Sequence, residues 1–214
     1  MKKILAIAFT VLVASGCAYN APVDIAPSYD VYSNYDDKVE GHYALYVDAE
    51  EMVKTVKAKG MACSAHNFPV DARAQFETSV LKTFENLVES VEVVDRPLTS
   101  EGLKSGGYKA QLVVEVRDLD VDLSVIPGAW TSTIEVDAEI TASITAQNFE
   151  GKLLGSTIEG DGDAEAESGA FCDGGSKAVG EAMADAMEET MERLGERLVN
   201  ARKIREQQAA TAGA

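Results

Sequence analysis

The chain contains few basic residues. It has 19 Lys and Arg against 36 Asp and Glu, which gives a formal net charge of −17 at pH 7. A surface of this sign repels nucleic acids, heparin-like polymers and anionic lipid head groups, because each of these carries negative charge itself. The composition therefore excludes nucleic acid as an expected partner.

Long apolar segments are also missing. The nearly all apolar run from Ile4 to Val13 has ten residues and follows Lys2 and Lys3. A helix needs about 20 apolar residues to cross roughly 30 Å of hydrocarbon, so this run is too short to span a membrane. A positive patch, a short apolar run and small residues before a cleavage site are typical of a secretory signal peptide. We therefore expect residues 1–16 to be removed.

Motifs for catalysis and cofactor binding are absent from the sequence. It contains no GxSxG, HExxH, CxxC or P-loop, and no GxGxxG between a strand and a helix. Ser64 and His66 are neighbours in sequence, but side chains two residues apart need not meet, and no third group is indicated. With two histidines in the chain, a zinc site is not expected. We predict no enzyme activity, no metal and no cofactor.

Cysteines are scarce, and the first of three lies at the predicted cleavage site. Val13-Ala14-Ser15-Gly16-Cys17 resembles the bacterial lipobox, in which small residues precede an obligatory cysteine. The resemblance implies that Cys17 carries a diacylglycerol thioether and an acylated amino terminus, so the covalent lipid is the membrane anchor. Ala18, in place of Asp, favours the periplasmic face of the outer membrane by the Gram-negative sorting rule. The alternative is a plain secretory signal with an incidental cysteine.

With Cys17 assigned to the lipid, two cysteines remain, Cys63 and Cys172. Export is expected to place both in an oxidising compartment. Exported proteins commonly join such a pair, so we predict a disulfide between them. Two alternatives remain open at this point. The cysteines are separate buried thiols, or Cys63 forms half of a metal site with His66.

The pattern of residues divides the mature chain into three parts. Residues 17–40 show neither helical nor strand periodicity and are predicted to be a lipidated, flexible tether, although their tyrosines provide possible partner contacts. Residues 41–206 are predicted to form a single periplasmic domain, and residues 207–214 a frayed end. The formal charge of the mature chain becomes −19, because residues 1–16 contain two lysines and no acids.

Within the domain, two helices are predicted from apolar stripes at helical spacing, over residues 71–88 and 176–205. Strands are predicted at 42–47, 91–94, 110–123, 132–146 and 154–158, and a loop at 99–107. After Asp118 the apolar parity switches, which indicates a bulge, a bend or a strand end. These elements predict an α+β two-layer sandwich, with a mostly antiparallel sheet of about five strands and two helices on one face.

Four groups of residues carry alternative interpretations. Val125, Ile126 and Trp130 lie in a predicted turn and are possible ligand or membrane contacts. The alternating carboxylates from Glu159 to Glu167 indicate a solvated strand face or a calcium site, although a calcium-binding loop is missing. Lysines between residues 54 and 59 form a solvated face or a docking point for an acidic partner. The methionines of the last helix belong to the core or to a ligand-binding surface.

The order of elements over residues 41–204 resembles small Gram-negative outer-membrane lipoproteins. These are the LPS-assembly lipoproteins, the YajG-type lipoproteins and the auxiliary lipoproteins of ABC transport systems. The lipid anchor, the single rigid domain, the long polar sheet face and the absence of catalytic motifs favour a non-catalytic adaptor, or an assembly or transport accessory factor, with an envelope protein partner. The alternative is a carrier of an apolar ligand, held between the sheet and the methionine-bearing helix. The acidic composition disfavours direct binding of anionic lipopolysaccharide.

Overall fold

The computed structural model of the chain describes residues 19–21, 23–27, 38–59, 63–168 and 172–206. The predicted signal peptide, the predicted lipidation site Cys17 and the predicted frayed end lie outside these residues. The elements along the described chain are β1 (Tyr19–Asn20), β2 (Val39–Asp48), β3 (Val53–Lys59), β4 (His66–Asp71), α1 (Arg73–Leu87), β5 (Val88–Val93), α2 (Ser100–Gly106), β6 (Ala110–Ile126), β7 (Thr133–Gln147), β8 (Lys152–Glu167) and α3 (Gly174–Val199).

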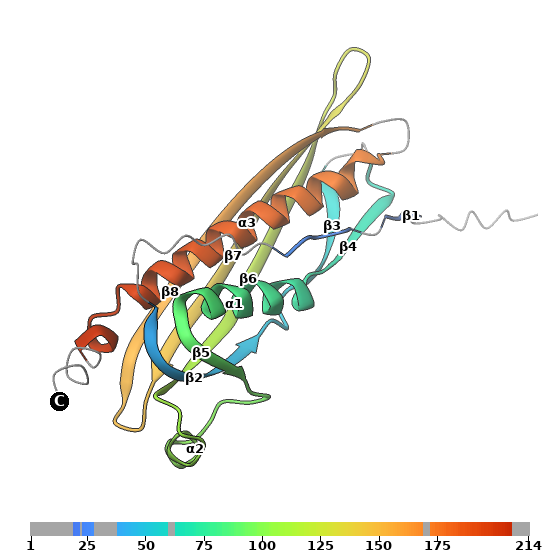
Figure 1. Cartoon of the computed structure of the whole chain (residues 1–214). Helices are drawn as coiled ribbons and strands as arrows, with labels where there is room; N and C mark the ends of the chain where they lie inside the picture. The colour runs from blue at the N-terminus through green and yellow to red at the C-terminus, as the bar shows by residue number, and fades with distance from the viewer. Residues whose placement is uncertain (1–18, 22, 28–37, 60–62, 169–171, 207–214) are drawn as a thin grey trace, which may run out of the picture.

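All strands of the described chain belong to one sheet, which is organised around β6. One edge of β6 pairs with β7 along its whole length, and β8 pairs with β7. The other edge of β6 pairs first with β2 and then, near its end, with β3. The remaining strands extend the sheet outward, β5 beside β2 and β4 and β1 beside β3. The result is a curled half-barrel (Figure 1).

The sheet differs from the predicted one in two respects. It has eight strands instead of about five, and it is mixed instead of mostly antiparallel, because β2 and β3 both run parallel to β6 and β5 runs parallel to β2. It is also strongly curled, so a flat two-layer sandwich is the wrong description. Strands 53–59 and 66–71 were missing from the prediction, because their few apolar positions alternate with lysines and polar residues.

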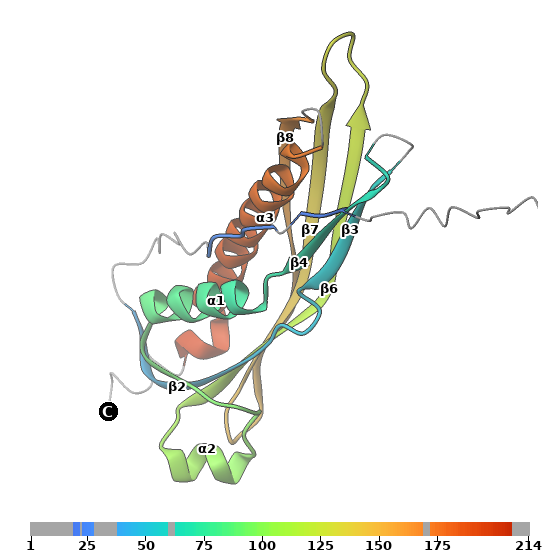
Figure 2. The ribbon, with the colours of Figure 1, turned by 90° about the vertical axis from the view of Figure 1, so that its right-hand side faces the viewer.

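Strands β6, β7 and β8 form a long antiparallel meander of 17, 15 and 16 residues. The regular alternation predicted for residues 132–146 is confirmed, since every second residue of β7 is buried. The register shifts between Val116 and Asp118, so the parity switch is a β-bulge within one continuous strand. The turn between β6 and β7 projects beyond the remainder of the sheet (Figure 2).

Helices α1 and α3 cover the same face of the sheet, as predicted (Figure 2). The stripe on α1 is buried through Phe76, Val80 and Phe84. The stripe on α3 is buried too, including its three methionines. Where the helices meet, the Ser79 hydroxyl donates a hydrogen bond to the Met187 sulfur at 3.2 Å. The methionines therefore belong to the core, as the first of the two interpretations predicted.

A short helix, α2, replaces the predicted loop at 99–107. The Thr99 hydroxyl caps its first turn by accepting a hydrogen bond from the Gly102 amide, and Gly107 ends it with a left-handed backbone, φ 69°. Both are standard helix-terminating features. The prediction of a loop was wrong because it followed the glycine and serine content of this segment and overlooked the capping residues Thr99 and Gly107.

Helix α3 lies in direct contact with the backbone of β8. A Cβ atom added at Gly160 would lie 2.2 Å from the Thr190 hydroxyl oxygen, and one added at Gly162 would lie 2.2 Å from the Ala182 carbonyl oxygen. On the helix, Ala182, Ala186 and Thr190 follow one another at i, i+4 and i+8, so they share one face. Small residues on both elements therefore permit this close packing.

Cys63 and Cys172 form a disulfide, with their Cα atoms 5.9 Å apart, which confirms the predicted pair. The bond excludes the alternative in which Cys63 and His66 share a metal. Cys63 precedes β4 and Cys172 lies two residues before α3, so the bond ties the β3–β4 connection to the start of the long helix.

The described part of the predicted tether is packed on the domain. Strand β1 pairs with β4, and the Ala21 amide donates a hydrogen bond to the Asn67 carbonyl. The exposed fractions of Ala21 and Ile25 are 6% and 4%, so both belong to the core. The segment has no helical or strand period, but the burial of these apolar side chains stabilises its contact with the domain. Periodicity indicates regular helices and strands and therefore misses such a segment. Residues 19–27 are thus not a free spacer where they are described.

Candidate functional site

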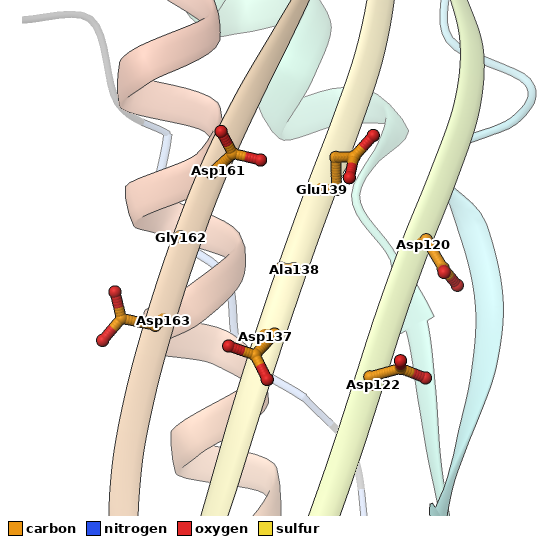
Figure 3. Close-up of a pocket in the computed structure, with 8 residues that line it drawn as sticks. All are labelled: Asp120, Asp122, Asp137, Ala138, Glu139, Asp161, Gly162 and Asp163. Carbon is orange, nitrogen blue, oxygen red and sulfur yellow. The ribbon is translucent and has the colours of Figure 1, made fainter.

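The open face of the β6–β8 meander carries a dense group of carboxylates. Because side chains alternate across a strand, the residues between the buried positions all point away from α3. Six of them surround a hollow of about 270 Å³, and we call them the acidic face: Asp120, Asp122, Asp137, Glu139, Asp161 and Asp163. Figure 3 shows that they come from three neighbouring strands.

Strand register places the six carboxylates in two rows. One row joins Asp120, Glu139 and Asp161, and the other joins Asp122, Asp137 and Asp163. Side chains directly opposite on antiparallel strands are about 5 Å apart at Cβ, where like charges destabilise the strand pair. The acidic face therefore works against the stability of the sheet that carries it.

Two lysines of β3 neutralise one side of the acidic face. The Lys54 ammonium lies 2.6 Å from the Asp120 carboxylate and also donates a hydrogen bond to the Leu119 carbonyl. Its hydrogen bond lowers the pKa of Asp120 from the usual value. The Lys59 ammonium lies 2.7 Å from the Asp122 carboxylate, and that hydrogen bond raises the pKa of Lys59. These two members of the predicted basic cluster thus form ion pairs within the chain.

The other four carboxylates have no such partners. Within the described residues, Asp137, Glu139, Asp161 and Asp163 form no ion pair with a lysine or arginine side chain. The negative field extends around the β8 edge, where burial and then the charge of Glu188 raise the pKa of Asp185. The β7–β8 half of the acidic face therefore presents carboxylates without a direct ion-pair partner to solvent, and Asp137 interacts with the charge of Lys59 at longer range.

The calcium interpretation of the carboxylates receives no support. Among the described residues, no group of three or more His, Cys, Asp and Glu side chains has a geometry that could hold a metal ion. The carboxylates of the acidic face are spread over three strands around an open hollow, whereas a calcium site needs six to eight oxygens converging on one point. The solvated strand face is the interpretation that the structure favours.

The predicted contact residues Val125, Ile126 and Trp130 lie together at the projecting turn. The exposed fraction is 46% for Ile126 and 99% for Trp130, while Val125 is half-buried. They do not line the acidic face, which begins farther down the same strands. The acidic face and the projecting turn are therefore two separate surfaces, although both belong to the β6–β8 meander.

A second hollow, of about 400 Å³, lies between α1, β2 and β5 and is lined mainly by apolar residues, including Leu45, Leu81 and Val93. Since the methionines of α3 are fully buried, the groove predicted beside them is not present in the described chain. Val47, at the hollow, pairs with Val114, twelve residues before Ile126 on β6. At about 3.3 Å per residue the projecting turn is roughly 40 Å away and cannot form the lip of this hollow.

Comparisons with known proteins identify no family. No protein-family model matches the chain, and no curated protein matches it. Among solved structures, a Xanthomonas campestris protein of the family model DUF330 is similar over 90% of this chain and 99% of its own, with 12% identity and a TM-score of 0.48. A neuraminyllactose-binding hemagglutinin homolog from Helicobacter pylori covers 87% and 98%, with 11% identity and a TM-score of 0.46.

A minor lipoprotein from Acinetobacter baumannii is similar over 74% of this chain and 91% of its own, with 9% identity and a TM-score of 0.40. In the described residues, no helix has the length and apolar character needed to cross a membrane.

Proposed function

We propose that this chain is a non-catalytic lipoprotein of the cell envelope that serves as an adaptor, or as an assembly or transport accessory factor. In this proposal Cys17 carries the lipid and holds the domain at the periplasmic face of the outer membrane. The acidic face is the docking surface, and its partner is an envelope protein with a basic surface.

The observation that carries the proposal is the set of four unpaired carboxylates on the open strands β7 and β8. Opposed like charges weaken a sheet, so a fold selected for stability alone gains nothing from them. A basic partner supplies the missing counter-charges, and complementary charge speeds association and rejects acidic competitors. The face is open over several strands, which suits a protein surface better than a small molecule.

We expect neutralisation of the acidic face to weaken capture of the partner. In the variant Asp137→Asn/Glu139→Gln/Asp163→Asn, recovery after crosslinking in intact cells should fall roughly tenfold, because three solvated charge pairs contribute about 0.5 kcal/mol each. The measurement is quantitative mass spectrometry of the crosslinked pull-down.

The matched control is Glu51→Gln/Glu192→Gln/Glu196→Gln, which removes the same charge from exposed positions elsewhere. This control should recover the partner at the unmodified level. Equal losses in both variants would reduce the effect to net charge and contradict a docking role for the acidic face. Recovery of no dominant partner by the unmodified protein would contradict the adaptor function itself.

A carrier function is the second candidate, and the hollow beside α1 favours it. Val93, with an exposed fraction of 55%, and the half-buried Leu81 form part of its apolar lining. If the hollow holds an apolar ligand, native mass spectrometry of protein purified from its own cells should show an adduct of lipid size. The variant Leu81→Asp should lose the adduct, whereas Ile126→Asp should keep it. A clean apo mass for the unmodified protein would contradict this candidate.

A further inference from the structure

The projecting turn between β6 and β7 differs in chemistry from the remainder of the surface. We define the hairpin tip as residues 125–133. No residue from 124 to 134 is charged, although charged residues make up 26% of the chain. The tip also carries the single Trp of the chain, Trp130, with its side chain 99% exposed, and Ile126, 46% exposed. An exposed Trp next to an exposed Ile in an uncharged segment makes the tip a candidate for contact with a surface outside the fold.

Strand pairing places the beginning of the described chain toward the hairpin tip. Tyr19 of β1 pairs with His66 of β4, the neighbouring Asn67 pairs with Lys57 of β3, and β3 meets β6 where Lys59 pairs with Ser124. Strand β3 runs parallel to β6 and therefore toward the tip, while β4 and β1 run in the opposite direction. By strand direction, Tyr19 therefore lies at the end of β1 that faces the hairpin tip.

This direction relates the hairpin tip to the predicted lipid anchor. Cys17 precedes Tyr19 by two residues, which span at most about 7 Å. A lipid on Cys17 therefore brings a bilayer to the end of the sheet that carries the tip. Trp prefers the interfacial zone of a bilayer, where its apolar ring and its N–H group are both accommodated.

The charged residues nearest the hairpin tip determine which net charge of lipid head groups it can approach. Glu167 pairs with Thr133, and Glu135 pairs with Glu165. Lys59 lies level with Ser124 on the other side of β6, but its ammonium forms an ion pair with Asp122, so the charge just below the tip is net acidic. These carboxylates would lie at the level of the head groups, where anionic lipids repel them. A net-neutral, zwitterionic surface is therefore the matching one.

We propose that the hairpin tip is a second membrane contact, which inserts Ile126 and Trp130 into the interface of a zwitterionic bilayer. Its geometry rests on the lipid anchor of the proposed function. Two contacts at one end would hold the long meander upright and present the acidic face sideways to a partner. A single lipid on a free tether would leave the orientation of the domain undefined.

The test uses the fluorescence of Trp130, which is specific because the chain has no other Trp. The lipidated protein is reconstituted in phosphatidylcholine vesicles, with and without bromine on the acyl chains. We expect emission to shift to shorter wavelength and bromine to quench it severalfold. Ile126→Asp keeps the reporter and should abolish both effects while the protein still floats with the vesicles. Phe149→Asp, at a residue with the same 46% exposed fraction in the β7–β8 turn, should behave as the unmodified protein.

Each other outcome overturns the inference. Emission of a water-exposed Trp in the floating unmodified protein would show that the tip stays outside the bilayer, as it would if it docked on a protein. Equal quenching of the Ile126→Asp variant would show proximity to the bilayer through the anchor alone. Failure to float is a separate result that concerns the anchor. In that case the chain from residue 18 is titrated with the same vesicles, and an unshifted emission overturns the inference as well.

Discussion

Replacement of Gly162 by Ala is expected to lower the free energy of unfolding by about 3 kcal/mol, at the upper end of the usual range for overpacking. The added Cβ would lie 2.2 Å from the Ala182 carbonyl oxygen and 2.4 Å from the Ala186 nitrogen. Both atoms belong to the backbone of α3, so neither can rotate away. The helix must move off β8, which opens the core along that strand. Chemical denaturation followed by circular dichroism measures the effect.

Gly155 provides a matched control in the same strand. A Cβ atom there would meet only the end of the Lys152 side chain, which can swing aside. Gly155→Ala should therefore change stability by no more than about 0.5 kcal/mol, or raise it slightly by restricting the unfolded chain. Similar losses in both variants would show that β8 tolerates no side chain at all, and would contradict close packing by α3 as the cause.

Loss of the disulfide is expected to have the second large effect. The bond closes a sequence separation of 109 residues, and the chain-entropy model assigns about 4–5 kcal/mol to a loop of this size. Reduction should lower the unfolding midpoint accordingly. Cys63→Ser, Cys172→Ser and the double variant should all be destabilised equally, because one bond is lost in each. Additive losses, or two titratable thiols in the native protein, would contradict the bond.

The backbone at the two cysteines sharpens this experiment. Both have left-handed conformations, with φ of 59° at Cys63 and 56° at Cys172, which are unfavourable for most residues with a side chain. Asn tolerates this conformation better than Ser. The double Asn variant should therefore be more stable than the double Ser variant by roughly 1 kcal/mol. Equal stabilities would indicate that the backbone relaxes at both positions once the bond is absent.

The elements that sequence analysis predicted well are those with a long, regular pattern. The stripes of α1 and α3 and the alternation of β7 are repeated several times, and each repeat depends only on nearby residues. The short elements β3 and α2 were not predicted, because neither contains a repeated pattern. Strand β3 has a single fully buried residue, Val56, and helix α2 has a single one, Leu103, so neither shows a period.

The acidic face was visible in the sequence as separate alternating patterns, but not as one surface. The carboxylates from Glu159 to Glu167 of β8 form an alternating pattern in the sequence, whereas Asp120 and Asp122 of β6 follow a change in parity and are not singled out by any pattern. The bulge before Asp118 returns them to the open side, and register then aligns them with Glu139 and Asp137. No local pattern specifies that alignment.

The sequence by itself predicted a signal peptide and a lipobox, and it determined a pair of cysteines available for bonding and the apolar faces of the long helices and strands. The cysteine pair follows from the small number of cysteines, and each of the other properties follows from residue types within a few positions of one another. The tertiary structure alone decided that β2 and β3 share one edge of β6, that Ala21 and Ile25 pack on the domain, and that carboxylates from three strands form two rows. These features arise from contacts between residues far apart in the chain, and their free energy depends on burial and register, which no short stretch of sequence contains.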